Sequence, residues 1–320
     1  GCRTRVMANR YDPERETTFG RGNLSFTSIN LPRLGLKHRG DVEGFFEELN
    51  EKISLVFGQL LERLEIQSHK RCRNYPFLMG QGIWLDSEDL APGDEVGEVL
   101  KHGTLTTGFI GLAECLKALI GVHHGESDEA QDLGLRIVRT MRERADAKGE
   151  ETGLNFTVIA TPAEGLAGRF VKYDRKRFGN IPGITDRDYY TNSFHIPVYF
   201  PISAFNKIRL EAPYHALTNG GHISYVEVDG DPLNNLQAFE DIVKAMKEMG
   251  IGYGSINHPV DRDPVCGYTG IIGDVCPRCG RHDGEGIPLS VLKQIKGYIR
   301  DSRSSDEQSE APDKIANIKL

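Results

Sequence analysis

The sequence lacks several features that mark common protein classes. No run of apolar residues reaches the roughly 20 positions that a membrane-spanning helix needs, and the first residues do not form a signal peptide. The chain has neither a P-loop nor a G-x-G-x-x-G fingerprint. Its formal net charge of -7 argues against electrostatic binding to nucleic acid or to anionic membranes. We therefore expect a cytoplasmic protein that binds neither membranes nor nucleic acid directly.

Cysteine is sparse, and its distribution is uneven. Six cysteines in 320 residues do not suggest a disulfide framework, and they favour metal ligands and reactive thiols in a reducing compartment. Three of them, Cys266, Cys276 and Cys279, lie close together near the carboxyl end. The C-P-x-C-G knuckle at Cys276 allows two thiolates to bind one face of a tetrahedral metal, because the following glycine lets the backbone turn. This segment predicts a zinc ribbon.

The first knuckle of this ribbon departs from the C-x-x-C pattern. It reads Asp263-Pro-Val-Cys266, so an aspartate stands where a cysteine is expected. Zinc also accepts carboxylate oxygen or imidazole nitrogen, so the fourth ligand is Asp263, His258, His282 or water, and we prefer Asp263. The alternative is a thiol cluster without a metal.

Apolar periodicity predicts an α/β architecture. Strands that run into helices recur along the chain, and functional loops in such folds lie at the carboxyl ends of the strands. We expect strands at residues 23–31, 104–112, 154–160, 207–210 and 222–228, and helices at 41–67, 113–120, 129–147 and 234–249. Asp41 is the expected N-cap of the first long helix. Residues 219–222 (NGGH) suggest a hairpin turn.

The tetrapeptide Thr161-Pro-Ala-Glu164 follows a buried strand directly. It predicts a helix with Thr161 as the N-cap, a proline at the first position and Glu164 at the third. Free backbone N–H groups and the helix dipole at such a start suit phosphate oxygens, although every capped helix offers them. The negative charge of Glu164 opposes an anion unless that side chain turns back to close the capping box. Thr161, Ala163 and Glu164 are candidate substrate-binding residues.

Two polar segments allow both a functional and a structural interpretation. Residues 189–195 (YYTNSFH) gather aromatic and polar groups around Asn192 and Ser193. They either line a nucleoside pocket or form a buried turn, and the sequence favours neither. His123 and His124 are adjacent, so on a helix they point about 100 degrees apart. We expect them to be hydrogen-bonded structural histidines and not ligands of one metal.

Two single residues stand near the ends of the chain. Cys2 lies beside Arg3 and Arg5, whose charges favour a thiolate, although a lone loop cysteine is usually inert. Gly297, between Lys296 and Tyr298, would ordinarily be a helix C-cap or a kink. Its unsubstituted Cα is also the kind of carbon that a stable backbone radical requires.

Taken together, these segments resemble the carboxyl-terminal half of the catalytic subunit of anaerobic (class III) ribonucleoside-triphosphate reductases, which are glycyl radical enzymes. The similarity extends in order from residue 1 to about 300. It is carried by the cysteine ribbon and by residues 1–5 (GCRTR), 20–24 (GRGNL), 29–33 (INLPR), 77–82 (FLMGQG), 102–105 (HGTL), 111–116 (GLAECL), 160–165 (ATPAEG), 190–195 (YTNSFH) and 219–224 (NGGHIS).

The resemblance implies a fold and a division of the chain. Residues 1–255 would form the carboxyl-terminal part of a ten-stranded α/β barrel with a finger loop inside it. Residues 256–300 would form a zinc ribbon and the glycyl radical loop. From their composition, rich in Ser, Asp and Glu, we expect residues 301–320 to be a disordered tail, and we find no likeness to the family in residues 302–320.

The resemblance also implies roles and partners. Cys2 matches the finger-loop cysteine whose thiyl radical takes the 3′ hydrogen of the ribose, and Gly297 matches the glycine that stores the radical. Cys266, Cys276 and Cys279 match three zinc cysteines, and Asp263 takes the place of the fourth. The implied partners are a ribonucleoside triphosphate substrate, a radical S-adenosylmethionine activase, formate or a redox protein as reductant, and a second copy in a homodimer.

Three alternatives remain at this level. The chain begins with Gly1 and lacks the family's amino-terminal part, so one interpretation is a fragment that needs an amino-terminal half, and a separately encoded half is one source of it. A different glycyl radical enzyme, such as a relative of formate-lyases or diol dehydratases, would typically lack the zinc ribbon. A zinc-ribbon binding module on an α/β scaffold would not be an enzyme.

Overall fold

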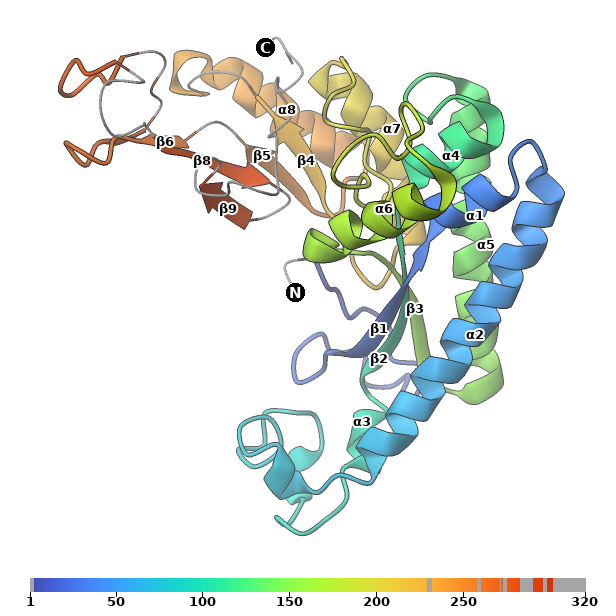
Figure 1. Ribbon diagram of the computed structural model, residues 1–320. Helices are drawn as coiled ribbons and strands as arrows, with labels where there is room; N and C mark the ends of the chain where they lie inside the picture. The colour runs from blue at the N-terminus through green and yellow to red at the C-terminus, as the bar shows by residue number, and fades with distance from the viewer. Residues whose placement is uncertain are drawn as a thin grey trace.

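The computed structural model describes residues 3–228, 232–257, 260–270, 272, 275–282, 290–295 and 298–301. A parallel sheet with the order β1-β2-β3 lies at its centre (Figure 1). The three strands were expected from their apolar pattern, and β2 and β3 are buried along their whole length. Their bounds are Asn23–Asn30 for β1, Thr104–Ile110 for β2 and Asn155–Ala160 for β3.

Two long helices cover this sheet and bury the largest apolar cluster against it. α2 (Val42–Ser68) and α5 (Asp128–Thr152) contribute Phe45, Leu49, Ile137 and Met141, all fully buried, to a core shared with the strands. Asp41 caps α2 as expected, because its carboxylate accepts a hydrogen bond from the backbone N–H of Gly44 at 3.0 Å. Both helices run along the sheet in Figure 1.

Shorter helices follow the carboxyl ends of the three strands. α1 (Leu31–Lys37) follows β1, α4 (Leu112–Ile120) follows β2, and α6 (Glu164–Phe178) follows β3. Residues between α2 and β2 pack around Trp84, whose indole N–H donates to the carbonyl of Val99 at 2.7 Å. The elements there are the 3₁₀ turns Cys72–Asn74 and Ser87–Asp89 and helix α3 (Gly97–Leu100).

A second parallel pair, β4 (Ser224–Glu227) with β5 (Gly254–Asn257), packs against α7 (Ala204–Leu217) and α8 (Leu236–Glu248). A 3₁₀ turn, Pro232–Asn234, precedes α8. The strand predicted at residues 207–210 is wrong, because these residues lie inside α7. The hairpin predicted at 219–222 is also wrong: the segment links α7 to β4, and β4 pairs in parallel with β5.

The carboxyl-terminal elements form a separate antiparallel sheet with the order β7-β6-β8-β9. Their bounds are Val260–Arg262 for β6, Thr269–Gly270 for β7, Ser290–Ile295 for β8 and Tyr298–Asp301 for β9. The described part of the chain is thus mixed α/β with parallel sheets, and closure into a barrel remains a prediction. Among the described helices, not one has both the length and the apolar character required to cross a bilayer.

Candidate active site and metal centre

The carboxyl ends of β1, β2 and β3 meet at one edge of the central sheet. There the hydroxyls of Ser28 and Thr161 share a hydrogen bond of 2.7 Å that passes over Gly108 of β2. A Cβ on Gly108 would lie 2.1 Å from Thr161 Oγ1 and 2.8 Å from Ser28 Oγ. Glycine is therefore required at this point of β2 for the two hydroxyls to approach.

The start of α6 differs from the expected capping box. The helix begins at Glu164 with Ala163 as its N-cap, and that N-cap residue makes no side-chain capping hydrogen bond. Thr161 is buried and its hydroxyl bonds Ser28, so the prediction that Thr161 caps the helix is wrong. The first N–H groups of this 15-residue helix are left without a side-chain acceptor at its N-cap, which makes them available to an anion. The Glu164 side chain lies outside the described part.

Arg3 is a site residue that the sequence did not single out. Its side chain is 1% exposed, and Nη1 donates to the carbonyls of Ala160 and Thr161 at 3.3 and 3.5 Å. Within the described residues, Nε and Nη2 have no hydrogen-bond acceptor and no carboxylate pairs with the guanidinium. Arginine cannot lose its charge in a protein, and a buried charge needs a counter-ion. An anionic group beside the end of β3 would supply one.

Asn192 and Ser193 are held at the same edge. The backbone N–H of Gly111, directly after β2, donates to the Thr191 carbonyl at 2.9 Å, and that of Leu112 donates to the Ser193 carbonyl at 3.1 Å. Asn192 and Ser193 are at most 1% exposed, yet both amide atoms of Asn192 and the Ser193 hydroxyl lack hydrogen-bond partners in the described part. Ser193 also has a φ of 42°. Unpaired buried polar groups and a left-handed backbone are typical of binding sites.

A buried ionic group lies next to this segment. Lys207 and Glu211, one turn apart on α7, form an ion pair and are 5% and 0% exposed. His195 Nδ1 lies 3.5 Å from Glu211 Oε2, and the N–H of Ile196 donates to Glu211 Oε1 at 2.9 Å. Burial lowers the pKa of His195 to about 4, so the imidazole is neutral at pH 7.

His123 and His124 have the structural role that was predicted. His124 Nε2 lies 2.7 Å from the carbonyl of Phe194, and the N–H of Gly125 donates to His123 Nδ1 at 3.0 Å. Burial lowers the pKa of each to about 4. Both are neutral side chains in hydrogen bonds at physiological pH.

The metal centre predicted from the cysteine spacing forms a compact donor group. One ligand atom from each of Asp263, Cys266, Cys276 and Cys279 lies within 4.8 Å of the others. Cys266 Sγ and Cys276 Sγ are 3.6 Å apart, close to the roughly 3.8 Å expected for two thiolates bound tetrahedrally at about 2.3 Å from zinc. Two turns with the same geometry present these donors.

Asp263 occupies the first position of one turn, and Cys276 occupies the same position of the other turn. The N–H of Gly267 donates to the Asp263 carbonyl at 2.9 Å, and that of Gly280 donates to the Cys276 carbonyl at 2.8 Å. Both glycines are left-handed, with φ of 73° and 72°. The D-x-x-C-G turn therefore reproduces the C-x-x-C-G knuckle and carries a carboxylate to the position of a thiolate.

The Asp263 carboxylate is also oriented for a metal. Its Oδ1 accepts hydrogen bonds from Arg281 Nη2 at 2.7 Å and from the N–H of Val265 at 2.8 Å, whereas Oδ2 lies 3.1 Å from Cys279 Sγ. The hydrogen bond from Arg281 is the main reason that the pKa of Asp263 lies below its usual range. Outer partners of this kind fix metal-binding carboxylates. His282 is outside the donor group, and His258 lies outside the described residues.

The two residues predicted to carry the radical, Cys2 and Gly297, lie outside the described residues. Their described neighbours are Arg3, at the edge site, and Ile295 and Tyr298, which pair with each other across β8 and β9. The proposed contact between Cys2 and Gly297 therefore stays a prediction.

An α/β scaffold whose parallel strands end in a buried polar site, followed by a Cys₃Asp group with the donor set of a metal site, defines a class of α/β proteins with a candidate metal centre. The sequence matches the family described as "Anaerobic ribonucleoside-triphosphate reductase" over residues 1–313. The chain belongs to this family.

Curated relatives agree with this assignment. The anaerobic ribonucleoside-triphosphate reductase of Salmonella typhimurium is 35% identical over 307 residues, which are 93% of this chain and 42% of that protein. The protein of the same name from Enterobacteria phage T4 is 33% identical over 310 residues, with 93% and 49% covered. The chain thus spans less than half the length of these relatives. The family match argues against a different glycyl radical enzyme and against a binding module.

Solved structures share the fold. An anaerobic ribonucleotide reductase superposes with a TM-score of 0.70 at 22% identity, covering 88% of this chain and 41% of that one. The Thermotoga maritima anaerobic ribonucleotide reductase in complex with dATP and CTP gives a TM-score of 0.66 at 22% identity, with 88% and 43% covered.

Proposed function

We propose that this chain is the carboxyl-terminal part of a reductase that converts ribonucleoside triphosphates to deoxyribonucleoside triphosphates without oxygen. The observation that carries the proposal is the convergence at the sheet edge of an uncapped helix start, the unpaired buried guanidinium of Arg3 and the unpaired amide of Asn192. Family membership supplies the reaction class. The nucleotides named in the Thermotoga structure support a nucleotide ligand.

The residues divide by chemistry. The first N–H groups of α6, including those near Ala163 and Glu164, would bind phosphate oxygens, and Arg3 would balance their charge. Thr161 would act by holding this loop against Ser28, since its hydroxyl is already in use. Asn192 and Ser193 would supply hydrogen bonds to the nucleoside, because their polar groups are buried and unpaired in the described part.

The radical step follows from the matches at Cys2 and Gly297. The Gly297 radical takes the hydrogen atom of the Cys2 thiol, which leaves a thiyl radical, and this radical takes the 3′ hydrogen of the ribose. The first transfer is reversible, so the backbone holds the radical between turnovers. A closed barrel would keep water and oxygen away from both steps.

The Cys₃Asp group fits zinc, which would supply a structural cross-link in the sheet that contains the described neighbours of Gly297. The remaining partners that we propose are a radical S-adenosylmethionine activase, formate or a redox protein as reductant, and a second copy in a homodimer, in the cytoplasm.

Substitution of Gly297 by alanine tests the radical assignment. After anaerobic activation of the complete enzyme, the parent protein should give a glycyl radical signal in electron paramagnetic resonance, and Gly297→Ala should give none. Alanine carries a methyl group on Cα, so the same radical cannot form there. Gly58→Ala is the matched control: a Cβ on Gly58 meets nothing within 4 Å on α2, and its signal should be unchanged. A signal that persists in Gly297→Ala would place the radical on another residue.

A further inference from the structure

The link between α7 and β4 joins the amino-terminal segment to the central sheet. On one side of this link, the N–H of Ala160, at the end of β3, donates to the Gly221 carbonyl at 2.9 Å. On the other side, Thr4 pairs with Gly221 in an antiparallel bridge, and the N–H of Arg5 donates to the Gly220 carbonyl at 2.9 Å. The two glycines therefore act as a short strand between β3 and the residues that follow the cysteine predicted to carry the thiyl radical.

This arrangement requires glycine at position 221. Gly221 has a φ of 141°, in a region that side-chain-bearing residues rarely adopt. A Cβ at this position would lie 2.0 Å from the Arg3 carbonyl oxygen and 2.9 Å from Thr4 Cα. A Cβ on Gly220 would lie 2.7 Å from Thr157 Oγ1 of β3. Both neighbouring backbones can approach the link only because these two side chains are missing.

His222, the next residue, binds the same amino-terminal segment through its side chain. Its Nδ1 lies 2.8 Å from the Thr218 carbonyl, which can only accept, so Nδ1 carries the proton and Nε2 is an acceptor. Nε2 lies 2.9 Å from Arg5 Nη1, which donates to it. Burial lowers the pKa of His222 to about 4, so the ring is neutral at pH 7. The hydrogen bond to Thr218 thus fixes the tautomer that accepts from Arg5.

Two further segments pack around this contact. A Cβ on Gly252, shortly before β5, would lie 2.4 Å from His222 Nε2 and 2.6 Å from Arg5 Nη1. The ring of His215 on α7 lies 4.2 Å from that of His222 between centroids. His215 Nδ1 accepts from the N–H of Gly252 at 3.0 Å, so its Nε2 donates to Ser224 Oγ at 2.9 Å. The positions of both rings are therefore set by hydrogen bonds on the side away from Arg5.

We propose that His222 is a positioning residue that, together with Gly221, holds residues 3–5 and thereby Cys2 at the carboxyl end of β3. The inference rests on the proposed role of Cys2 in hydrogen-atom transfer. Such a transfer needs a close approach of the reacting atoms, and a displacement of about 1 Å can cost roughly 100-fold in rate. Cys2 is joined to Arg3 by one peptide bond, so the contacts of residues 3–5 limit where its sulfur can lie.

Hydrogen exchange on the 320-residue chain tests the contact without any need for activity. In His222→Ala the amide of Arg5, resolved by mass spectrometry with electron-transfer fragmentation, should exchange about tenfold faster, because the segment opens locally. His222→Gln should restore exchange to within about threefold, since its amide can donate to Thr218 and accept from Arg5. His124→Ala is the matched control, because His124 is equally buried but bonds the Phe194 carbonyl. Unchanged exchange in His222→Ala, or equal acceleration in His124→Ala, would overturn the proposal.

A double-mutant cycle tests whether Arg5 and His222 act through one contact. Arg5→Met should accelerate exchange at residue 5 about as much as His222→Ala, after correction for intrinsic exchange rates, and the double variant should exchange no faster than either single one. Effects that multiply would show that the two side chains act independently, which would overturn the proposal. If His222→Ala does not fold, Arg5→Met decides alone, and unchanged exchange there is equally contrary.

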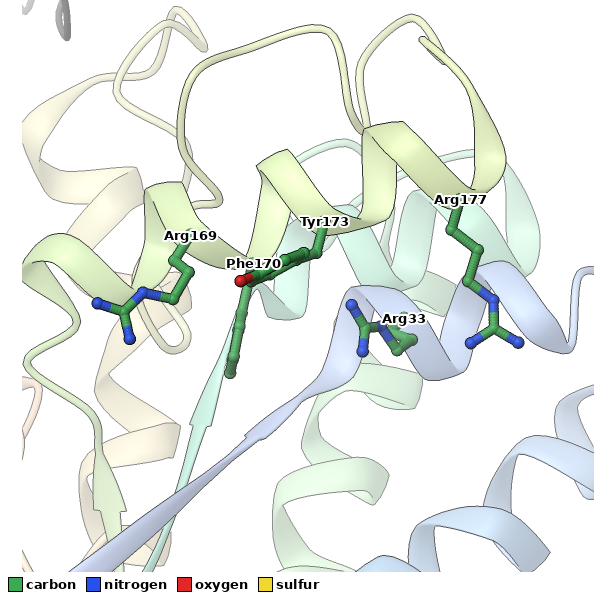
Figure 2. Close-up of a pocket in the computed structure, with 5 residues that line it drawn as sticks. All are labelled: Arg33, Arg169, Phe170, Tyr173 and Arg177. Atoms are coloured by element: carbon green, nitrogen blue, oxygen red, sulfur yellow. The ribbon is translucent and has the colours of Figure 1, made fainter.

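Arg177 provides the control for the loss of an arginine. It lies on α6, where it lines a pocket between α1 and α6 together with Arg33, Arg169, Phe170 and Tyr173 (Figure 2). Arg177→Met removes one positive charge from a helix that takes no part in the contact, so exchange at residue 5 should change less than about twofold. A larger change would mean that net charge, and not the contact with His222, controls the segment.

Kinetics of the complete enzyme test the consequence for the reaction. After anaerobic activation, His222→Ala should lower kcat at least about tenfold and change KM less than about threefold, and His222→Gln should recover most of the loss. The glycyl radical signal should keep its parent intensity, because storage of the radical on Gly297 does not need Cys2 in place. A raised KM with an unchanged kcat would assign His222 to substrate binding and would overturn the positioning role. Absence of the radical signal in the parent enzyme would instead contradict the proposed function and leave the exchange result standing.

Discussion

Replacing Cys276 with serine is expected to reduce zinc affinity by more than about 100-fold, because a thiolate that binds the metal directly is lost. Cys276 is 1% exposed and lies 3.6 Å from Cys266 Sγ, so no other described cysteine can take its place without rearrangement of the turn. The parent chain should contain about one equivalent of zinc by elemental analysis after dialysis. The serine variant should contain almost none.

Controls separate the metal site from general thiol chemistry. Cys72 is buried in the cluster around Trp84, outside the donor group, so Cys72→Ala should keep its zinc. Arg281→Gln removes the ion pair to Asp263 Oδ1 and leaves the four donor residues in place, so it should weaken zinc binding about 10- to 100-fold. Asp263→Cys should retain zinc with four thiolates. Zinc-free parent protein after anaerobic purification in zinc-containing medium would support the metal-free thiol cluster.

The sequence predicted all three strands of the central sheet, and β2 and β3 were predictable because both of their faces are buried. β2 and β3 are buried along their whole length, so their apolar runs are short, continuous and followed by helix signals. The grouping of the four donor residues was also predictable, because C-x-x-C spacing is local and the substituted turn keeps its glycine. Gly267 and Gly280 have nearly the same φ.

The misassigned α7 shows where pattern alone fails. Its buried face includes Ala204, Ile208 and Ala212, but also the charged Lys207 and Glu211. Because two charged residues occupy core positions, the apolar row with helical spacing consists only of Ala204, Ile208 and Ala212, and two of these three are small. The remaining pattern was the alternation of charged and apolar residues at 207–210, which is typical of a strand. The buried ion pair between Lys207 and Glu211 is therefore the reason that α7 was not predicted as a helix at these residues.

The site contacts that the sequence did not predict join segments that are distant in the chain. Thr161 fits a capping box locally, yet its hydroxyl bonds Ser28, 133 positions earlier. Arg3 reaches the Ala160 carbonyl across a separation of 157 residues. The pocket between α1 and α6 combines Arg33 with α6, through an ion pair to Asp174 that spans 141 residues. A motif read from one sequence is local, so it does not predict contacts between residues that are so far apart in the chain.

Replacing Glu211 with alanine is expected to lower the free energy of unfolding by about 3–5 kcal/mol, because it leaves Lys207 buried without its partner. Both side chains are almost fully buried, and Glu211 also accepts the N–H of Ile196. Urea denaturation followed by circular dichroism measures the change. Glu240→Ala is the control: Glu240 pairs with Lys244 at the same spacing, but both side chains are more than half exposed. Its effect should stay below about 1 kcal/mol.

A double variant separates two contributions to the free energy of unfolding. One is the loss caused by an unpaired Lys207, and the other is the net contribution of the Lys207–Glu211 pair. Lys207→Met with Glu211→Leu removes both charges and keeps apolar volume, so it should recover most of the stability lost in Glu211→Ala. If the double variant is as unstable as the single one, the loss comes from packing or from the Ile196 hydrogen bond and not from an unpaired Lys207.

The lowered pKa of Glu211 predicts that the fold loses stability as the pH falls. Burial alone would raise the pKa of Glu211, but Lys207 and His195 together lower it below its ordinary value. A carboxyl whose pKa is lower in the folded chain stabilises the fold above its unfolded pKa of about 4.3, and this contribution is lost as the pH falls toward the folded pKa. The parent chain should therefore lose stability relative to the double variant as the pH drops below about 4. A difference that does not change between pH 7 and pH 3 would show that the carboxylate keeps the same pKa on unfolding, and that the buried pair acts through shape and not through charge.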